Sequence, residues 1–339
     1  MESIYRNISL IFCESGKEFG KKVYNHLASL CREKNINFKL IDTEEIWFKN
    51  GEVKSTIKEP VRGDDVYIVQ LLNDPLSEKS INDNFMAFLT AIDAAHQSDA
   101  GQITGILPQY PYSRQERRKE REGITAKLTS RIMEDLGLER VVTVDIHAEA
   151  IAGFFDRAKL ENLHASNAII DELQKIYRDS NFVVVAPDTG GTDRARFYAK
   201  KMAKDFAIIY KSRDYSKIST IDIMKLIGDV KDRDVFVVDD MIDTGGTIIK
   251  ACALLKENGA RKVVVACTSP FFSGDGVQKM SKAFEDGIID LVIGTDAVYW
   301  GDDFVKEQEW YREVTVAPLF AQVILNIHQN KSISVLLDM

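Results

Sequence analysis

Short apolar runs alternate with amphipathic stretches along most of this chain. The runs are rich in Val and Ile, which is typical of strands buried on both faces of a parallel sheet. Strands are predicted at residues 8–12, 66–70, 103–107, 141–144, 182–185, 206–209, 235–238, 263–266, 291–293 and, last, 333–337. Apolar positions at helical spacing predict helices at residues 17–32, 84–96, 124–136, 248–257 and 317–328. This alternation predicts parallel sheets joined by right-handed crossovers.

The alternation runs twice through the 339 residues, which predicts two α/β domains, each large enough to bury its own core. No Pro- or Ser-rich linker marks the boundary between them. We place it near residues 155–160, so that residues 1–157 form the first domain and residues 158–317 the second.

Nearly every predicted strand is followed by residues that can bind or react. The segments are Pro108-Gln109-Tyr110, Asp145-Ile146-His147, Pro187-Asp188-Thr189, Lys211-Ser212-Arg213 and Asp239-Asp240. In doubly wound sheets, ligands bind outside the carboxyl ends of the strands. We therefore expect these residues on one face of each sheet.

The segment from Val235 to Thr247 reads as a buried strand, an acidic Gly-containing turn and the start of a helix. Its last four residues, Thr244 to Thr247, would present backbone N–H groups and hydroxyls at a helix N-terminus. Such a turn can hold a phosphate without a basic side chain. The spacing differs from the P-loop, because no Gly-Lys-Ser/Thr follows. The carboxylates of Asp239 and Asp240 would repel a phosphate unless they bind something else, such as sugar hydroxyls or Mg²⁺. The alternative is a Gly-rich turn with an acidic N-cap.

Composition narrows the class of protein. The chain is 45% hydrophobic and 28% charged, as in soluble globular proteins, and its net charge of −8 argues against nucleic acid as a main partner. Its 4 cysteines show no CxxC spacing, so we expect reduced thiols and neither a zinc site nor a disulfide framework. Without a recognisable signal peptide or membrane-spanning run, we expect a cytoplasmic protein that does not bind membranes.

The segment Asp239 to Thr247 resembles the phosphoribosyl-diphosphate (PRPP) motif of type I phosphoribosyltransferases and ribose-phosphate pyrophosphokinases. The resemblance implies that Asp239 and Asp240 meet the ribose hydroxyls of ribose 5-phosphate. It also implies that the following loop holds the 5-phosphate, through Asp243, Thr244, Gly245, Gly246 and Thr247.

Two segments of the first half resemble the ATP-binding segments of the pyrophosphokinases. Phe48-Lys49-Asn50-Gly51-Glu52 stands where that family carries Phe-Ser-Asp-Gly-Glu, on a hairpin that reaches the adenine of ATP in a neighbouring subunit. Phe48 and Glu52 match, whereas Asn50 replaces a carboxylate by an amide. Tyr112-Ser113-Arg114-Gln115-Glu116-Arg117 is similar to Tyr-Ala-Arg-Gln-Asp-Arg, which implies that ATP is bound by Arg114, Gln115 and Arg117. Without the resemblance, this charge run would be typical of a solvated helix face.

Three further segments supply the implied metal-binding and catalytic residues. Asp145-Ile146-His147-Ala148 resembles the family's Asp-Leu-His-Ala, so His147 would bind the Mg²⁺ that accompanies ATP. Pro187-Asp188-Thr189-Gly190-Gly191 resembles Pro-Asp-X-Gly-Gly, in which the aspartate, here Asp188, helps to hold Mg²⁺. Lys211-Ser212-Arg213 is similar to the Lys-Arg-Arg that opens a mobile catalytic loop, here residues 214–221. Lys211 and Arg213 would stabilise the diphosphoryl group in transfer.

Together these segments resemble the ribose-phosphate pyrophosphokinase family over most of the chain. The resemblance implies two tandem type I phosphoribosyltransferase-like domains, each a mostly parallel sheet flanked by helices, with residues 318–339 returning to the first. The implied reaction transfers the β,γ-diphosphoryl group of Mg·ATP to the 1-hydroxyl of ribose 5-phosphate, giving PRPP and AMP. The implied assembly is a homo-oligomer, a dimer or hexamer, with the adenine site shared between subunits.

Two alternatives stay open at this point. A type I phosphoribosyltransferase would consume PRPP, but it needs only one α/β domain and a hood, and the first domain with Arg114 and His147 argues against it. A non-catalytic paralogue that regulates a true synthetase would explain the departures from the family's motifs at Asn50, Asp193 and Ser269.

Overall fold

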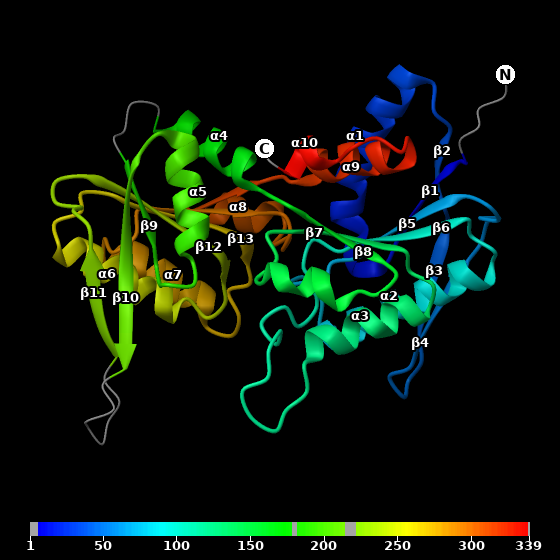
Figure 1. Ribbon diagram of the computed structural model, residues 1–339, viewed down its shortest axis with the longest axis horizontal. Helices are drawn as coiled ribbons and strands as arrows, with labels where there is room; N and C mark the ends of the chain where they lie inside the picture. The colour runs from blue at the N-terminus through cyan, green and yellow to red at the C-terminus, as the bar shows by residue number, and fades with distance from the viewer. Residues whose placement is uncertain (1–5, 178–181, 214–221, 338–339) are drawn as a thin grey trace. The chain divides into compact units, whose positions relative to one another are not determined.

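The computed structural model describes residues 6–177, 182–213 and 222–337 (Figure 1). The chain forms two compact units. Residues 1–164, 297–300 and 315–339 make the first unit, and residues 165–296 and 301–314 make the second. Each unit is a mostly parallel sheet flanked by helices, and each is described by itself.

The sheet of the first unit has six parallel strands in the order β2-β1-β5-β6-β7-β8. Their bounds are β1 Ile8–Phe12, β2 Phe38–Leu40, β5 Asp65–Val69, β6 Gln102–Ile106, β7 Arg140–Val144 and β8 Lys159–Leu163. Every residue of β1 and β5 is buried, as continuous apolar runs require when helices cover both faces. An antiparallel hairpin, β3 (Thr43–Trp47) and β4 (Val53–Ile57), stands outside this sheet.

Helices cover both faces of this first sheet. Figure 1 shows α1 (Lys17–Lys34) and α9 (Ala317–His328) on one face, and α2 (Ile81–Gln97) and α3 (Thr125–Asp135) on the other. Helix α9 is bound to the sheet by polar contacts as well as by packing. The Tyr67 hydroxyl donates to the Ile324 carbonyl at 3.3 Å, and His328 Nδ1 lies 2.8 Å from Asp65 Oδ2. These contacts hold the C-terminal segment in the first unit.

The sheet of the second unit has seven strands in the order β11-β10-β9-β12-β13-β14-β15, all parallel except β11. Their bounds are β9 Phe182–Ala186, β10 Asp205–Arg213, β11 Asp222–Ile227, β12 Asp234–Ile242, β13 Val263–Pro270, β14 Leu291–Thr295 and β15 Tyr311–Val314. The flanking helices are α4 Ser166–Ile176, α5 Thr192–Met202, α6 Gly246–Glu257, α7 Gly276–Glu285 and α8 Asp302–Glu307. Right-handed crossovers that leave β9 and β12 in opposite directions put α5 and α6 on opposite faces (Figure 1).

The expected elements are present, with two differences of type or extent. Residues 333–337 were expected to form a strand, but Ser334–Leu337 is the short helix α10, so that expectation is wrong. Strands β10 and β12 run past their apolar cores, and therefore Lys211, Asp239 and Asp240 lie inside strands. Apolar periodicity marks only the buried part of a strand, whereas backbone pairing continues into polar residues.

The boundary between the units follows His164, whereas we expected it after residue 157. The difference is strand β8, which pairs along β7 and so belongs to the first sheet. Its sequence, Lys-Leu-Glu-Asn-Leu, carries too little apolar character to be recognised as a strand. All four cysteines are free and buried, as expected. Among the described residues, no helix combines the length and the hydropathy needed to cross a membrane.

Candidate active site

The second unit brings its candidate residues together where its sheet changes direction. From β9 the chain continues to β10 on one side, and from β12 it continues to β13 on the other, so the switch point lies between β9 and β12. Val185 of β9 pairs with Val237 of β12, which is the last pair of this register, and Asp188 follows in the turn after β9 ends at Ala186. Asp239 and Asp240 lie at the end of β12, the adjacent strand. The two acidic motifs therefore both lie at the carboxyl edge of this sheet, where doubly wound sheets bind ligands.

The loop after β12 presents the N-terminus of α6. The backbone N–H groups of Phe272 and Ser273 donate to the carbonyls of Ile242 and Asp243, at 3.1 and 2.9 Å, and fix the start of the loop. Gly245 is the N-cap with φ 79°, and no side chain among the described residues caps this helix. The first turn of α6 thus offers backbone N–H groups and the positive end of the helix dipole, which favours an anion.

Asp239 and Asp240 form a tight acidic pair on β12. The backbone N–H of Asp240 donates to Asp239 Oδ1 at 2.9 Å, so the first carboxylate folds back toward the second. Burial and the charge of Asp240 raise the pKa of Asp239 well above its usual value, and Arg194 opposes that rise. Arg194 Nη1 lies 3.3 Å from Asp240 Oδ1 and 3.6 Å from Asp239 Oδ1.

Arg194 was not among the residues selected from the sequence. It lies on the first turn of α5, two residues before an exposed arginine, Arg196, from which the local pattern does not distinguish it. Its role depends on α5 packing against β12, a contact that the sequence pattern does not encode. The neighbouring Asp193, where the sequence departs from the family pattern, is 95% exposed and pairs with Arg196, away from the acidic pair.

Asp188 lies in the turn between β9 and α5. Its Oδ1 accepts a hydrogen bond from the backbone N–H of Gly191 at 3.0 Å, which closes the turn in front of the helix. A Cβ on Gly190 would come within 3.2 Å of the same oxygen, so glycine leaves the carboxylate room. Asp188 therefore stabilises the turn that precedes α5, and it lies at the carboxyl edge of the sheet, where a ligand would bind.

Lys211 and Arg213 lie on an extension of β10, not on a loop that leaves it. Strand β10 pairs with β9 only as far as Ile208, and its remainder pairs with antiparallel β11. Lys211 is paired with Met224, about 10 Å beyond the last β9 contact at about 3.3 Å per residue. The expectation that the strand ends at Ile209 is therefore wrong, and the expected mobile catalytic loop, residues 214–221, lies outside the described residues.

In the first unit, the segment expected to bind ATP leaves β6 as an irregular turn. Gln115 donates its backbone N–H to the Tyr112 carbonyl at 2.8 Å, and Arg114, Gln115 and Arg117 are exposed. Residues 111–124 form no helix, so the charge run is not a helix face. The preceding Gln109 and Tyr110 are buried and have structural contacts. Gln109 bridges the Asn73 N–H and the Ala297 carbonyl, at 2.9 Å each.

His147 is an exposed residue that follows β7, the neighbour of β6. The turn before it is constrained. Asp145 has a positive φ of 44°, and its carboxylate lies 2.9 Å from Nδ1 of His164. The backbone N–H of Ile146 donates to Asn162 Oδ1 at 2.9 Å, which fixes the turn against β8. These contacts define the direction in which the chain leaves the sheet toward His147.

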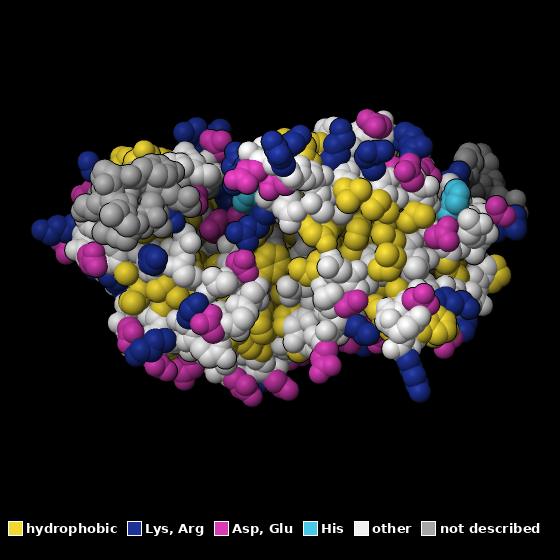
Figure 2. Space-filling view, turned by 90° about the horizontal axis from the view of Figure 1, so that it is seen from below, with side chains coloured by type: hydrophobic (Ala, Val, Ile, Leu, Met, Phe, Trp, Pro, Cys, Tyr) yellow, Lys and Arg dark blue, Asp and Glu magenta, His cyan; other side chains and the backbone are white. Residues whose placement is uncertain are grey.

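The segment from Phe48 to Glu52 is the tip of the β3–β4 hairpin. The Phe48 N–H donates to the Glu52 carbonyl at 2.8 Å, and the Asn50 side chain accepts from the Glu52 N–H at 3.2 Å. Phe48 is 50% exposed. A hollow of about 490 Å³ lies beside the tip, lined by hairpin residues and by the first turns of α2. Figure 2 looks onto the face of the first unit that carries α2 and α3, and hydrophobic side chains gather there.

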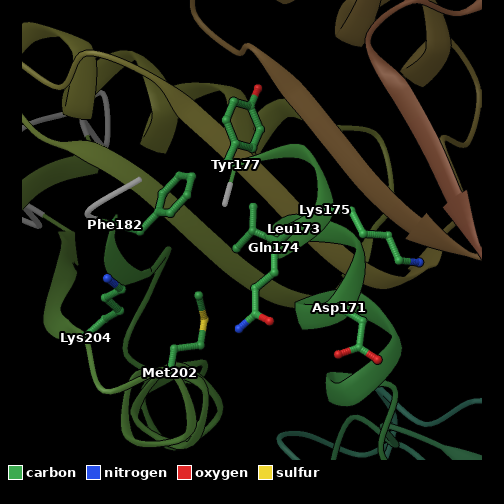
Figure 3. A pocket seen from close by; sticks show the side chains of 8 residues that line it. All are labelled: Asp171, Leu173, Gln174, Lys175, Tyr177, Phe182, Met202 and Lys204. Atoms are coloured by element: carbon green, nitrogen blue, oxygen red, sulfur yellow. The ribbon is translucent and has the colours of Figure 1, made fainter. Parts of the chain in front are cut away.

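A second hollow, of about 500 Å³, lies in the second unit but away from the acidic pair (Figure 3). Its lining comes from the end of α4, the start of β9 and the end of α5, and includes Gln174, Phe182 and Met202. Since helices run antiparallel to the strands they follow, these ends lie at the amino edge of the sheet. This hollow is therefore not part of the candidate site.

The geometry of the second unit agrees with the class of protein that the sequence resembles. A mostly parallel sheet with an acidic pair and a Gly-Thr loop at its switch point is the arrangement expected of a phosphoribosyltransferase-like domain. Comparison with known proteins extends this to the whole chain. A family model described as the N-terminal domain of ribose phosphate pyrophosphokinase matches residues 8–137, and one for the phosphoribosyl transferase domain matches residues 157–304.

Individual relatives agree with these domain matches. The chain is 36% identical over 333 residues to a ribose-phosphate pyrophosphokinase of Chlorobaculum tepidum, a match that covers 98% of this chain and 95% of that protein. It is 40% identical over 294 residues to one of Haemophilus ducreyi, covering 86% and 89% of the two chains. The crystal structure of phosphoribosylpyrophosphate synthetase from Mycobacterium smegmatis superposes with a TM-score of 0.82 at 30% identity, over 96% of this chain and all of that one. The chain belongs to the ribose-phosphate pyrophosphokinase family.

Proposed function

We propose that this chain makes PRPP and AMP from ribose 5-phosphate and ATP with the residues assigned below. The observation that carries the assignment is that the acidic pair of β12, the Asp188 turn after the adjacent strand β9 and the N-terminus of α6 lie at the same edge of one sheet. Carboxylates suit sugar hydroxyls, and a helix N-terminus suits a phosphate. A ligand that carries both groups a few ångströms apart, such as ribose 5-phosphate, fits this edge of the sheet.

For ribose 5-phosphate, Asp243 to Thr247 would bind the phosphate through backbone N–H groups and the two threonine hydroxyls. Asp239 and Asp240 would accept hydrogen bonds from the 2- and 3-hydroxyls of the ribose. This division keeps the carboxylates away from the phosphate, which they would repel. It also leaves the 1-hydroxyl uncovered as the attacking group.

For ATP, Arg114 and Arg117 would contact phosphate oxygens, for which their planar guanidinium groups suit bidentate contacts. Gln115 would add a neutral hydrogen bond. Phe48 would stack on the adenine, with Asn50 and Glu52 meeting its polar edge. The Asn50 side-chain oxygen accepts the Glu52 N–H and keeps a second lone pair, so this amide could accept a hydrogen bond from the base as well as donate one.

Mg²⁺ is the metal that this family implies, and the donor atoms present fit it in part. The Asp188 carboxylate is a hard oxygen ligand at the ligand edge of the sheet, with one oxygen held by Gly191. No three His, Cys, Asp or Glu side chains cluster as a metal site within the described residues. Mg²⁺ sites of this kind need few protein ligands, because Mg²⁺ keeps several waters and takes other ligands from substrate phosphates. We assign His147 of the first unit to the Mg²⁺ that accompanies ATP, and Asp188 of the second unit to Mg²⁺ at the ribose-binding edge; when bound, Mg²⁺ neutralises phosphate charge.

Catalysis then depends on positioning and charge, because diphosphoryl transfer requires no covalent bond to the protein. Lys211 and Arg213 would stabilise the negative charge on the transferring group. Their place on the β10 extension, beyond the sheet edge, supports this, since a ligand at that edge lies beside the extension.

The assembly we propose is a homo-oligomer in which the β3–β4 hairpin completes the adenine site of a neighbour. Exposed apolar side chains on the hairpin and on α2 support it: Phe48 is 50% and Met86 53% exposed, and a monomer seldom leaves such groups clustered. Mixing inactive Phe48→Ala with inactive Lys211→Ala subunits tests the sharing. Mixed oligomers regain activity if the hairpin acts across the subunit boundary, and stay inactive if it acts within its own subunit.

The reaction itself is tested by incubating the protein with ribose 5-phosphate, Mg²⁺ and ATP and following AMP and PRPP by chromatography. Formation of both products in equal amounts, lost in Lys211→Ala, supports the proposal. Product from a nucleotide other than ATP would indicate that Asn50, which stands where the family carries Asp, changes the base that the enzyme selects. No product from any donor, with co-purification of an active synthetase, would support the regulatory paralogue instead.

A further inference from the structure

Arg194 connects the two acidic motifs of the second unit. It lies on α5, the helix that follows the Asp188 turn, and its guanidinium reaches across to β12. Its side chain is only 21% exposed, and Nη1 lies within 3.6 Å of both carboxylates of the acidic pair. By contrast, Arg196 on the same helix is 67% exposed and pairs with Asp193, its neighbour on the helix surface.

An acidic pair at this place has an electrostatic problem. Two adjacent, partly buried carboxylates repel each other, so one of them tends to take up a proton or to rotate away. Either change would spoil the site, because an ionised carboxylate only accepts hydrogen bonds, whereas a protonated one donates. The hydrogen bond from the Asp240 N–H to Asp239 Oδ1 stabilises one rotamer but does not cancel the charge of the pair.

We propose that Arg194 is a positioning residue for ribose 5-phosphate, which pairs with the carboxylates of Asp239 and Asp240 and spaces them to accept hydrogen bonds from two neighbouring ribose hydroxyls. The inference rests on the assignment of that pair to the ribose. It goes beyond that assignment, because the affinity for ribose 5-phosphate would then depend on Arg194, a cation that does not contact the sugar. The same contact ties the α5 helix, and with it the Asp188 turn, to the ribose-binding strand.

The charges around the pair agree with this role. Within the described residues, the titratable groups that act on Asp239 are Asp240 on its own strand and Arg194 on α5, and Asp239 in turn acts on the Cys267 thiol of β13. Burial, then Asp239 and Asp240, raise the pKa of that thiol, so it stays neutral and adds no charge. Arg194 is the cation among these groups.

The test compares Arg194→Gln, Arg194→Lys and the surface control Arg196→Gln. We expect Arg194→Gln to raise KM for ribose 5-phosphate about 10- to 100-fold, the effect of one charged hydrogen bond, while KM for ATP and kcat change less than about threefold. Arg194→Lys keeps the charge and should recover much of the affinity. Raising the pH to about 9 should reduce the increase in KM for ribose 5-phosphate that Arg194→Gln causes, because the carboxylates then ionise without a neighbouring cation. Arg196→Gln should match the wild type.

Three outcomes would overturn the inference. One is an unchanged KM for ribose 5-phosphate in Arg194→Gln, and another is a loss shared equally by both substrates and kcat, as a general structural defect gives. The third is a defect that is independent of pH and equally large in Arg194→Lys. If Arg194→Gln does not fold by thermal unfolding, Arg194→Lys and its pH profile decide the question.

The variant Asp240→Asn distinguishes failure of this inference from failure of the proposed ribose-binding role of the acidic pair. If Asp240→Asn leaves ribose 5-phosphate binding at the wild-type level in calorimetry, the acidic pair does not hold the ribose, and both proposals fail. If Asp240→Asn weakens binding but Arg194→Gln does not, the site assignment stands and only the role of Arg194 is lost.

Discussion

Gly245 offers the sharpest test of the phosphate loop. It is the N-cap of α6 with φ 79°, a conformation that costs an L-residue about 1 to 2 kcal/mol. In Gly245→Ala the new Cβ would also lie 3.1 Å from Met280 Sδ and 3.5 Å from Ile249 Cδ1. The methionine side chain can yield by a few tenths of an ångström, so the backbone term dominates. The substitution should therefore cost about 1 to 2 kcal/mol in total.

The free-energy cost of Gly245→Ala appears either in stability or in affinity, depending on whether the loop keeps its conformation. If the loop keeps its conformation, the free energy of unfolding falls by the full amount, and phosphate still binds. If the loop relaxes, the protein keeps its stability, but ribose 5-phosphate binds about 5- to 30-fold more weakly, the same free energy expressed as affinity. Urea unfolding and calorimetric titration with ribose 5-phosphate measure the two parts, and their sum should be about 1 to 2 kcal/mol.

Gly287→Ala is the matched control. Gly287 also has a positive φ, of 67°, and a Cβ there meets nothing within 4 Å. It follows α7, away from the loop, so its substitution should lower stability by a similar amount and leave the affinity unchanged. A Gly245→Ala protein with wild-type stability and wild-type affinity would refute the reasoning. So would an equal loss of affinity in Gly287→Ala.

Three further predictions follow from the other parts of the site. Lys211→Ala should lower turnover about 100- to 1000-fold with ribose 5-phosphate affinity nearly unchanged, while Lys225→Ala on the paired strand stays close to wild type; equal turnover in both variants contradicts the role. Asp239→Asn should raise the thermal unfolding midpoint at about pH 8 although it weakens ribose binding, because the folded pKa of this carboxyl is raised and its ionised form costs stability. That gain should fade as pH falls below the folded pKa and vanish below about pH 4, where the carboxyl is protonated in both states; a gain that persists there would exclude this cause. His147→Ala should raise the Mg²⁺ concentration for half-maximal activity about tenfold or more without changing the affinity for ribose 5-phosphate alone, and an unchanged Mg²⁺ requirement would remove His147 from the metal site.

The sequence by itself determined the longer amphipathic helices, the buried strands and most of the candidate chemistry. Runs such as Val235 to Val238 are apolar on both faces, and this local pattern already requires a strand covered on both sides. The acidic and Gly-Thr turn that follows is also local, so a phosphate site could be predicted there without knowledge of the fold. The helix from Ala317 to His328 was predicted with its observed bounds, because its apolar face is long and regular.

Only the tertiary structure decided which of these residues meet. The pairing of β9 with β12 brings the Asp188 turn and the acidic pair to the same edge of one sheet, and the packing of α5 brings Arg194 onto the acidic pair. The structure also shows that Gln109, which the sequence pattern placed among the candidate ligand-binding residues, is buried. Periodicity along one segment reports whether that segment is buried, but not which segment lies beside it. Pairing between strands and packing between helix and sheet are set by contacts distant in sequence, and these fixed the site.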